Sequence, residues 1–314
     1  MNTPPPQTAA VIDIGSNTIK LLVAGAEHGR LVERTTQTLE TRLSTGLGQA
    51  TQLTFGEETI EQGVQAVRQL LETARKHTPD AVAIVATSAV RSAANGVAFA
   101  ERLREATGFP LRILSGDEEA QQIARGVATD PELATADRFH LLDLGGGSLE
   151  IVRVRQTRLD RALSLPLGAV RLTERHCLRP EAPIAPETLQ AIAREVDTEL
   201  GQAGFAFERP FGPLVGTGGG VTITRSLLAR EQGASIDEVS ALLPLADLIR
   251  LRDALAQLPM DARIRQFGLP ANRADILPTA LAVLVRLTEL AGTDGITQSF
   301  HNLRYGVAAE LLRF

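Results

Sequence analysis

The chain has 314 residues, about twice the length that usually forms one domain, which predicts two domains in one polypeptide. Hydrophobic residues make up 44% and charged residues 22%, the balance of a globular protein with a sizeable core. The 37 acidic and 32 basic residues give a net charge of −5, which argues against a broad basic surface. We therefore expect neither nucleic acid nor a membrane as a partner.

Three features predict a cytoplasmic protein. Cys177 is the only cysteine, which excludes an intramolecular disulfide and fits a reducing compartment. The opening segment, MNTPPPQTAA, lacks a basic start and a long apolar core, so we do not expect a signal peptide. The longest apolar run, residues 276–285, is too short to span a bilayer.

Strands and helices alternate along the first part of the chain, which predicts an α/β fold. We expect strands at 9–14, 19–24, 31–38, 81–86 and 111–114, and helices at 57–76, 95–106 and 115–127.

The opening pattern returns near the middle of the chain. Residues 140–154 (HLLDLGGGSLEIVRV) follow the same order as residues 9–24: an apolar strand ends in Asp-x-Gly, turns through small residues and re-enters a strand. This repeat predicts two duplicated domains, which we place at residues 1–124 and 125–314. After the repeat we expect a strand at 159–166, a helix at 186–203, a strand at 213–215, then a helix, with the last third mostly helical.

Turns of small residues follow three of the predicted buried strands. Glycine lets a ligand approach the backbone closely, and successive N–H groups form a nest for phosphate oxygens. Three tight turns without a ligand are the alternative, but the repetition favours phosphate binding. The candidate phosphate ligands are Gly15, Ser16, Asn17, Thr18, Gly145, Gly146, Gly147, Ser148, Gly216, Gly218 and Gly219.

Competing motifs are absent from the sequence. There is no Gly-x-x-x-x-Gly-Lys-Ser/Thr segment, and Val221 stands where a dinucleotide fingerprint needs its third glycine. There is no Gly-x-Ser-x-Gly elbow, and the five histidines show no metal-ligand spacing. We expect Cys177 to be a buried small apolar residue.

Carboxylates stand beside two of the three turns. Asp13 and Asp143 each end a predicted strand at a phosphate-sized nest, and Glu150 follows on the next strand. Carboxylate oxygens suit Mg²⁺, which also binds phosphates, so these residues are candidate metal ligands. The alternative is that each aspartate only caps its turn.

Two glutamates open the helix at 115–127. Ser115 and Glu118 have the spacing of a capping box, which gives Glu118 a structural role. Glu119 lies about 100° further round the helix and is free to face a cleft. The alternative for Glu119 is an ordinary acid that favours the helix dipole.

These motifs stand in an order that resembles the exopolyphosphatase/guanosine pentaphosphate phosphatase family. The matching segments are Asp13-Ile-Gly-Ser-Asn17, Thr87-Ser-Ala-Val-Arg91 with Asn95, Ser115-Gly-Asp-Glu-Glu119, Asp143-Leu-Gly-Gly-Gly-Ser-Leu-Glu150, Gly168-Ala-Val-Arg171, Gly216-Thr-Gly-Gly-Gly220, Arg273-Ala-Asp275 and Leu303-Arg304-Tyr-Gly306. Asn302 departs from the family pattern, which has a glycine there. Longer relatives also carry a C-terminal helical domain beyond the position of Phe314, so we expect less surface for long chains.

The resemblance implies two duplicated actin-like (ribonuclease H-like) domains with an active-site cleft between them. It also implies that Glu119 activates water, that Arg91 contacts the phosphate chain, and that Asp143 and Glu150 serve a Mg²⁺ site. The expected reaction is hydrolysis of the terminal phosphoanhydride of inorganic polyphosphate. The alternative substrate is guanosine pentaphosphate, which would link the enzyme to the stringent response.

Other classes of function stay open. A kinase of the same fold would transfer phosphate to a small acceptor, and a sensor of phosphate or nucleotide would bind without turnover. The oligomeric state is also open, with a homodimer as one expectation.

A group of arginines in the second half has two interpretations. It is either a remote track for long polyphosphate or a solvated sheet face paired with Asp160 and Glu174. The group comprises Arg153, Arg155, Arg158, Arg161, Arg171 and Arg175.

Overall fold

A computed structural model describes residues 7–43, 53–156 and 158–314 of the chain. The opening segment, for which we expected no signal peptide, lies mostly outside the described residues, since residues 1–6 are not among them. The chain divides into two compact units. The first unit comprises Met1–Thr135 and His301–Phe314, and the second comprises Ala136–Phe300.

The first unit is built on a mixed sheet whose described strands stand in the order β3-β2-β1-β4-β5. Apolar residues of β1 and β2, such as Ile12 and Leu21, pack with Val67 and Leu70 of α1 in one core. The strands are β1 (Thr8–Ile14), β2 (Thr18–Glu27), β3 (Arg30–Glu40), β4 (Ala81–Ala86) and β5 (Leu111–Ile113), and the helices are α1 (Glu57–Arg75), α2 (Ser88–Ser92), α3 (Gly96–Thr107), α4 (Gly116–Val127), the 3₁₀ helix η1 (Pro131–Leu133) and α12 (Leu303–Leu312).

The second unit has a sheet in the order β10-β11-β9-β6-β7-β8. The apolar helix α11 lies in its core and packs against α5, α6, α7 and α8. The strands are β6 (Arg138–Leu144), β7 (Leu149–Arg155), β8 (Arg158–Leu165), β9 (Leu214–Thr217), β10 (Leu242–Pro244) and β11 (Gly295–Gln298), and the helices are α5 (Ala169–His176), α6 (Pro186–Gln202), α7 (Gly219–Glu231), α8 (Leu245–Ala256), α9 (Met260–Phe267), α10 (Ala271–Ala274) and α11 (Leu277–Ala291).

The two sheets confirm the duplication predicted from the sequence. The order β3-β2-β1-β4-β5 corresponds to β8-β7-β6-β9-β11, with antiparallel pairs at the first two steps and parallel pairs at the last two. The register also repeats, because Asp13 lies opposite Lys20 and Asp143 lies opposite Glu150. The α/β class and the actin-like duplication are therefore correct.

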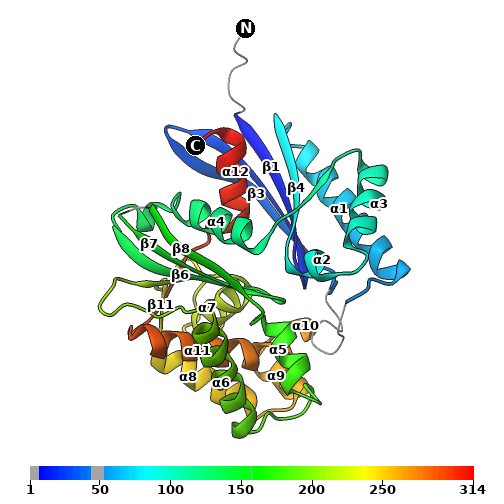
Figure 1. Ribbon diagram of the computed structural model, residues 1–314. Helices are drawn as coiled ribbons and strands as arrows, with labels where there is room; N and C mark the ends of the chain where they lie inside the picture. Colours follow the sequence, from blue (N-terminus) through cyan, green and yellow to red (C-terminus); the bar gives the residue numbers. More distant parts are fainter. Residues whose placement is uncertain (1–6, 44–52, 157) are drawn as a thin grey trace. The chain divides into compact units, whose positions relative to one another are not determined.

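The domain boundary predicted at residue 124 differs from the division of the structure. That residue lies inside α4, which belongs wholly to the first unit. The C-terminal helix α12 also returns to the first unit, where it packs on α4 and β1, as the red helix beside the blue strand shows (Figure 1). The cause is long-range packing, since the Arg304 side chain donates a hydrogen bond to the carbonyl of Leu21.

The last third is mostly helical as predicted, but it also contains β10 and β11. These strands have three and four residues, and β11 completes the parallel part of the second sheet beside β9. A four-residue segment carries too little periodicity to be recognised from the sequence.

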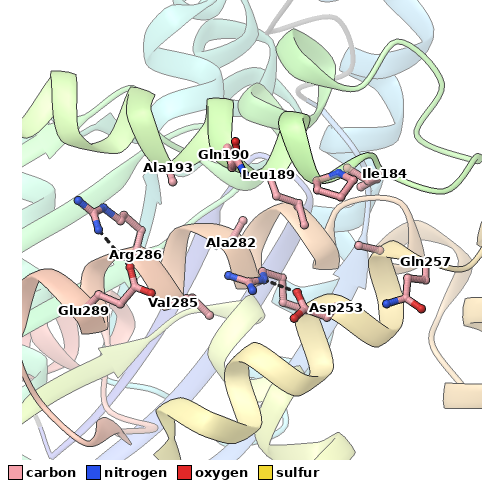
Figure 2. A pocket seen from close by; sticks show the side chains of 13 residues that line it. Ile184, Leu189, Gln190, Ala193, Asp253, Gln257, Ala282, Val285, Arg286 and Glu289 are labelled. Carbon is pink, nitrogen blue, oxygen red and sulfur yellow. Dashed lines mark hydrogen bonds and ion pairs between the residues drawn. The ribbon is translucent and has the colours of Figure 1, made fainter.

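A pocket of about 440 Å³ lies among α6, α8 and α11 in the second unit (Figure 2). Ala282 and Val285 of α11 line it, and the ion pair of Arg252 with Asp253 stands at its side. None of the candidate site residues lines this pocket, so it is separate from the chemistry considered below. Among the described residues, no helix has the length and apolar character that crossing a membrane requires.

Candidate active site

The first two turns predicted to bind phosphate have the same local structure. The N–H of Gly15 donates to the carbonyl of Thr18 at 3.0 Å, and the N–H of Gly145 donates to the carbonyl of Ser148 at 3.0 Å. Each turn joins two antiparallel strands, and the strand residues on either side of the turn pair with each other across the sheet. The sequence repeat therefore corresponds to two equivalent turns, one in each unit.

The second turn is hydrogen-bonded to the start of α5. Backbone N–H groups of Ala169 and Val170 donate to the carbonyls of Gly145 and Gly146 at 2.9 Å. A Cβ on Gly168 would lie 2.3 Å from the Gly146 oxygen, so only glycine allows this approach. Two carbonyls of the turn are thus fixed by the start of α5.

Arg171 was placed by the sequence analysis in the arginine group and not at the second turn. It stands on α5, and its Nε donates to the carbonyl of Gly147 at 2.9 Å. The guanidinium therefore lies at the second turn. The motif Gly168-Ala-Val-Arg171 was the available signal. Its arginine makes this hydrogen bond, and its glycine allows the close approach to the turn.

The third turn is shorter than predicted. Gly216 lies in β9, where a Cβ would meet Ile296 at 2.4 Å, so its glycine serves packing and not a phosphate nest. The turn itself is at Gly218, whose φ of +96° favours glycine. Gly219 then begins α7 and lies near Arg273, a second arginine that was not assigned to the site.

The candidate metal ligands fall into two groups. Asp143 and Glu150 face each other on neighbouring strands and share one face of the second sheet. Ser164 donates to Glu150 Oε1 at 2.7 Å, and Asp143 Oδ1 lies close to the third turn, 2.7 Å from where a Cβ on Gly218 would stand. Asp13 belongs to the first unit.

This donor set fits Mg²⁺. Both residues offer only oxygen, and Mg²⁺ in phosphate enzymes uses one or two carboxylates together with substrate oxygens and water. The described residues contain no group of three or more histidines, cysteines or carboxylates arranged to hold a metal by themselves.

Glu119 is buried on α4 and has no part in capping the helix. Ser115 and Glu118 form the predicted capping box, with Ser115 N donating to Glu118 Oε2 at 2.8 Å. That backbone hydrogen bond, and then the Arg112 side chain, hold the pKa of Glu118 below its usual value. Glu119 itself is 6% exposed. The capping role predicted for Glu118 is confirmed, and the catalytic role of Glu119 stays a prediction.

Arg91 and Glu119 meet in an ion pair. Arg91 Nη1 donates to Glu119 Oε2 at 2.8 Å and also to the carbonyl of Leu114 at 2.8 Å. Arg91 comes from α2, which follows β4, whereas Glu119 comes from α4, which follows β5. The structure thus brings together the two residues that were named as catalytic.

Other residues of the family-like motifs are structural. Asn95 accepts a hydrogen bond from Phe55 N and donates one to Phe55 O, both at 2.9 Å. Asn302, which departs from the family pattern, caps α12 by accepting from the N–H of Arg304 at 3.1 Å.

Cys177 is buried, as predicted. Burial raises the pKa of its thiol, which suits an inert core residue.

The arginine group mostly follows the interpretation of a paired sheet face. Arg153 contacts Asp160 at 2.5 Å and Glu208 at 2.9 Å, and Arg155 contacts Glu208 at 2.7 Å. Arg161 donates to backbone carbonyls. Glu208 is a partner that the sequence analysis did not name, and these pairs neutralise much of the proposed track.

Two duplicated sheets, each with a small-residue turn after its first strand, define a two-domain protein of the actin-like class. The chain belongs to the Ppx/GppA phosphatase family, whose family model matches residues 22–313. It is therefore a phosphatase-type hydrolase.

Solved structures of similar proteins share this fold. A PPX-GPPA enzyme of Aquifex aeolicus is 25% identical with a TM-score of 0.80, covering 99% of this chain and 100% of that one. An exopolyphosphatase of Cytophaga hutchinsonii is 23% identical with a TM-score of 0.85, covering 98% of each chain.

Proposed function

We propose that the protein is an exopolyphosphatase that releases orthophosphate from the end of inorganic polyphosphate. The observation that carries this proposal is the buried carboxylate of Glu119, held by Arg91 while the neighbouring Glu118 caps the helix. A sensor that only binds phosphate has no need of such a carboxylate. A hydrolase needs one to activate water.

Glu119 is the proposed general base. It takes one proton from a water molecule while the water oxygen forms a bond to the terminal phosphorus. The bridging P–O bond breaks, and its electron pair remains on the shortened chain. Phosphoryl transfer of this kind depends mainly on positioning and on neutralising charge. Arg91 orients the Glu119 carboxylate through its contact at 2.8 Å, and its remaining donors suit a phosphate oxygen.

Each unit also offers groups that we propose for phosphate binding. Backbone N–H groups of the turns at Gly15 to Thr18, at Gly145 to Ser148 and at Gly218 and Gly219 hold phosphate oxygens. Arg171 and Arg273 bring positive charge to the second and third of these turns.

Mg²⁺ is the proposed cofactor. Asp143 and Glu150 would hold it, since they offer oxygen ligands on one face of the second sheet. When bound, the ion offsets the negative charge of the phosphates. Asp13 holds the equivalent position in the first unit, opposite Lys20, and we propose it as a further carboxylate for the metal.

Guanosine pentaphosphate is the second candidate substrate. It needs the same phosphate chemistry and in addition a surface on which a base stacks. The chain has one tyrosine and no tryptophan, and Tyr305 is buried, stacked on His301 and bonded to Glu33. Because few aromatic side chains are available for a base to stack on, polyphosphate is the favoured substrate.

The deciding experiment measures phosphate release from long polyphosphate and from guanosine pentaphosphate, each with Mg²⁺ and with chelator. We expect release from polyphosphate that depends on Mg²⁺. Faster release from guanosine pentaphosphate would reverse the choice of substrate. Transfer from ATP to a small acceptor, without hydrolysis, would identify a kinase instead.

A further inference from the structure

A second pocket lies in the first unit, beside the first phosphate turn. Its volume is about 340 Å³, and the residues that line it include Thr41, Arg42, Thr54, Thr59 and Gln62. This size suits a small polar ligand or one segment of a longer one.

One wall of the pocket is bonded directly to the first phosphate turn. The N–H groups of Thr41 and Arg42 both donate to the carbonyl of Asn17 at 3.1 Å. Asn17 is in turn one of the candidate phosphate ligands. The position of Arg42 is therefore fixed relative to the turn that holds a phosphate.

The other wall is bonded to the segment that carries Arg91. Leu53 pairs with Ala93, and the N–H of Ala94 donates to the carbonyl of Leu53 at 2.7 Å. Asn95 fixes the next part of the same wall through its two hydrogen bonds with Phe55. The pocket thus stands between the first turn and the helix of Arg91.

Arg42 has a backbone conformation that needs a reason. Its φ is +45°, in the left-handed region where side chains other than glycine are disfavoured. Such strain persists at a position where the surrounding structure imposes it, and it is frequent at ligand sites. The hydrogen bonds that Thr41 and Arg42 donate to Asn17 impose it here, and Arg42 lines the pocket.

We propose that Arg42 binds a phosphate of the substrate other than the one that is cleaved, and so helps to set affinity for the chain. This inference rests on the proposed function. A guanidinium forms short, charge-assisted hydrogen bonds to phosphate oxygens. Glu58 also lines the pocket and accepts a hydrogen bond from Gln62 at 3.1 Å. Its negative charge keeps the phosphate on the Arg42 side.

The test uses Arg42→Gly, which removes the side chain and accepts a positive φ. The matched control is His28→Gly, because His28 has a φ of +49° at the other end of the same strand pair, β2 and β3. In both variants the relief of strain and the greater freedom of the unfolded chain offset each other, so the melting temperature stays close to that of the wild type.

We expect Arg42→Gly to raise KM for tripolyphosphate by about 10- to 100-fold, the loss of one hydrogen-bonded charge, with kcat little changed. Arg42→Lys should restore part of the affinity, and Glu58→Gln should lower KM. His28→Gly should leave both constants unchanged. Equal KM values for Arg42→Gly and His28→Gly would overturn the proposal.

A binding measurement separates this inference from the proposed function. Tripolyphosphate affinity is measured by calorimetry in the Glu119→Gln background, in which we expect binding without turnover. If the wild type binds tripolyphosphate but releases no phosphate, the proposed function fails and Arg42 is judged from affinity alone. If the wild type turns over and Arg42→Gly does not weaken binding, the function stands and the role of Arg42 is refuted.

Discussion

Replacing Glu119 by glutamine separates catalysis from folding. The side chain keeps its shape, and its remaining oxygen still accepts from Arg91, which also stays bonded to the Leu114 carbonyl. The cost is the difference between a charged and a neutral hydrogen bond, about 1 kcal/mol in the free energy of unfolding. The capping box is untouched because it uses Ser115 and Glu118.

The effect on activity should be much larger. Loss of the general base predicts a decrease in kcat of about 10²- to 10⁴-fold, while KM holds or falls as one negative charge leaves the site. Glu118→Gln is the matched control on the neighbouring residue. Glutamine still accepts from the Ser115 N–H but lacks the charge that pairs with Arg112, so the change should cost about 0.5–1 kcal/mol of stability with kcat preserved.

The two variants should therefore cost similar amounts of stability but have opposite effects on catalysis. Phosphate release from tripolyphosphate reports catalysis, and urea unfolding reports stability. The reasoning is refuted if Glu118→Gln is the inactive variant while Glu119→Gln turns over normally.

Three further predictions follow from the second unit. Asp143→Asn should raise the Mg²⁺ concentration needed for half-maximal rate, because an amide is a poorer ligand for a hard cation, and undiminished activity in chelator would exclude the metal. Gly218→Ala should lower the free energy of unfolding by about 2–4 kcal/mol, because its Cβ meets the Leu144 carbonyl at 2.6 Å, whereas Gly233→Ala meets nothing and should cost about 1 kcal/mol. Burial and then the charge of Arg153 lower the pKa of His140 from 6.5 to about 4, so the unfolded chain takes up this proton first as the pH falls. Stability should therefore drop below pH 6.5, by at most about 1.4 kcal/mol per pH unit, and His140→Met should remove that part of the slope in acid unfolding curves.

The parts of the fold set by local patterns could be predicted from the sequence. The strand that ends in Asp-x-Gly recurs because each unit needs the same turn, and the Gly15 and Gly145 hydrogen bonds are equivalent. The capping box of Ser115 and Glu118 could be predicted because its two partners are only three positions apart.

The parts set by distant contacts could not be predicted in the same way. Gly216 belongs to a glycine-rich segment, but a glycine is needed there because a Cβ would collide with the Ile296 side chain. Ile296 lies in β11, a strand that was not predicted from the sequence. The ion pair of Arg91 and Glu119 joins residues 28 positions apart and depends on the order of β4 and β5 in the sheet. Helix α12 was assigned to the wrong unit because nothing local marks its packing on α4.

The arginines of β7 show how such distant partners change a functional prediction. On the sequence alone, Arg153 and Arg155 form a concentration of positive charge that could attract polyphosphate. In the structure, Asp160 and Glu208 pair with both, and the four charges cancel. We now expect Arg153→Gln with Arg155→Gln to leave kcat/KM for long polyphosphate unchanged from low to high salt.

The same double variant should be less stable. It leaves the two carboxylates without their cations, and because the Arg153 side chain is only 18% exposed, the loss should be about 1–2 kcal/mol and not the smaller value of a surface pair. Urea unfolding measures that loss, and kinetics on triphosphate and on long chains across a salt series measure binding. A rise in KM confined to long chains, and shrinking as salt screens the charges, would show that a polyanion competes successfully with Asp160 and Glu208 for these arginines. In that case the pairing seen in the structure would describe only the free protein, and the track would be real.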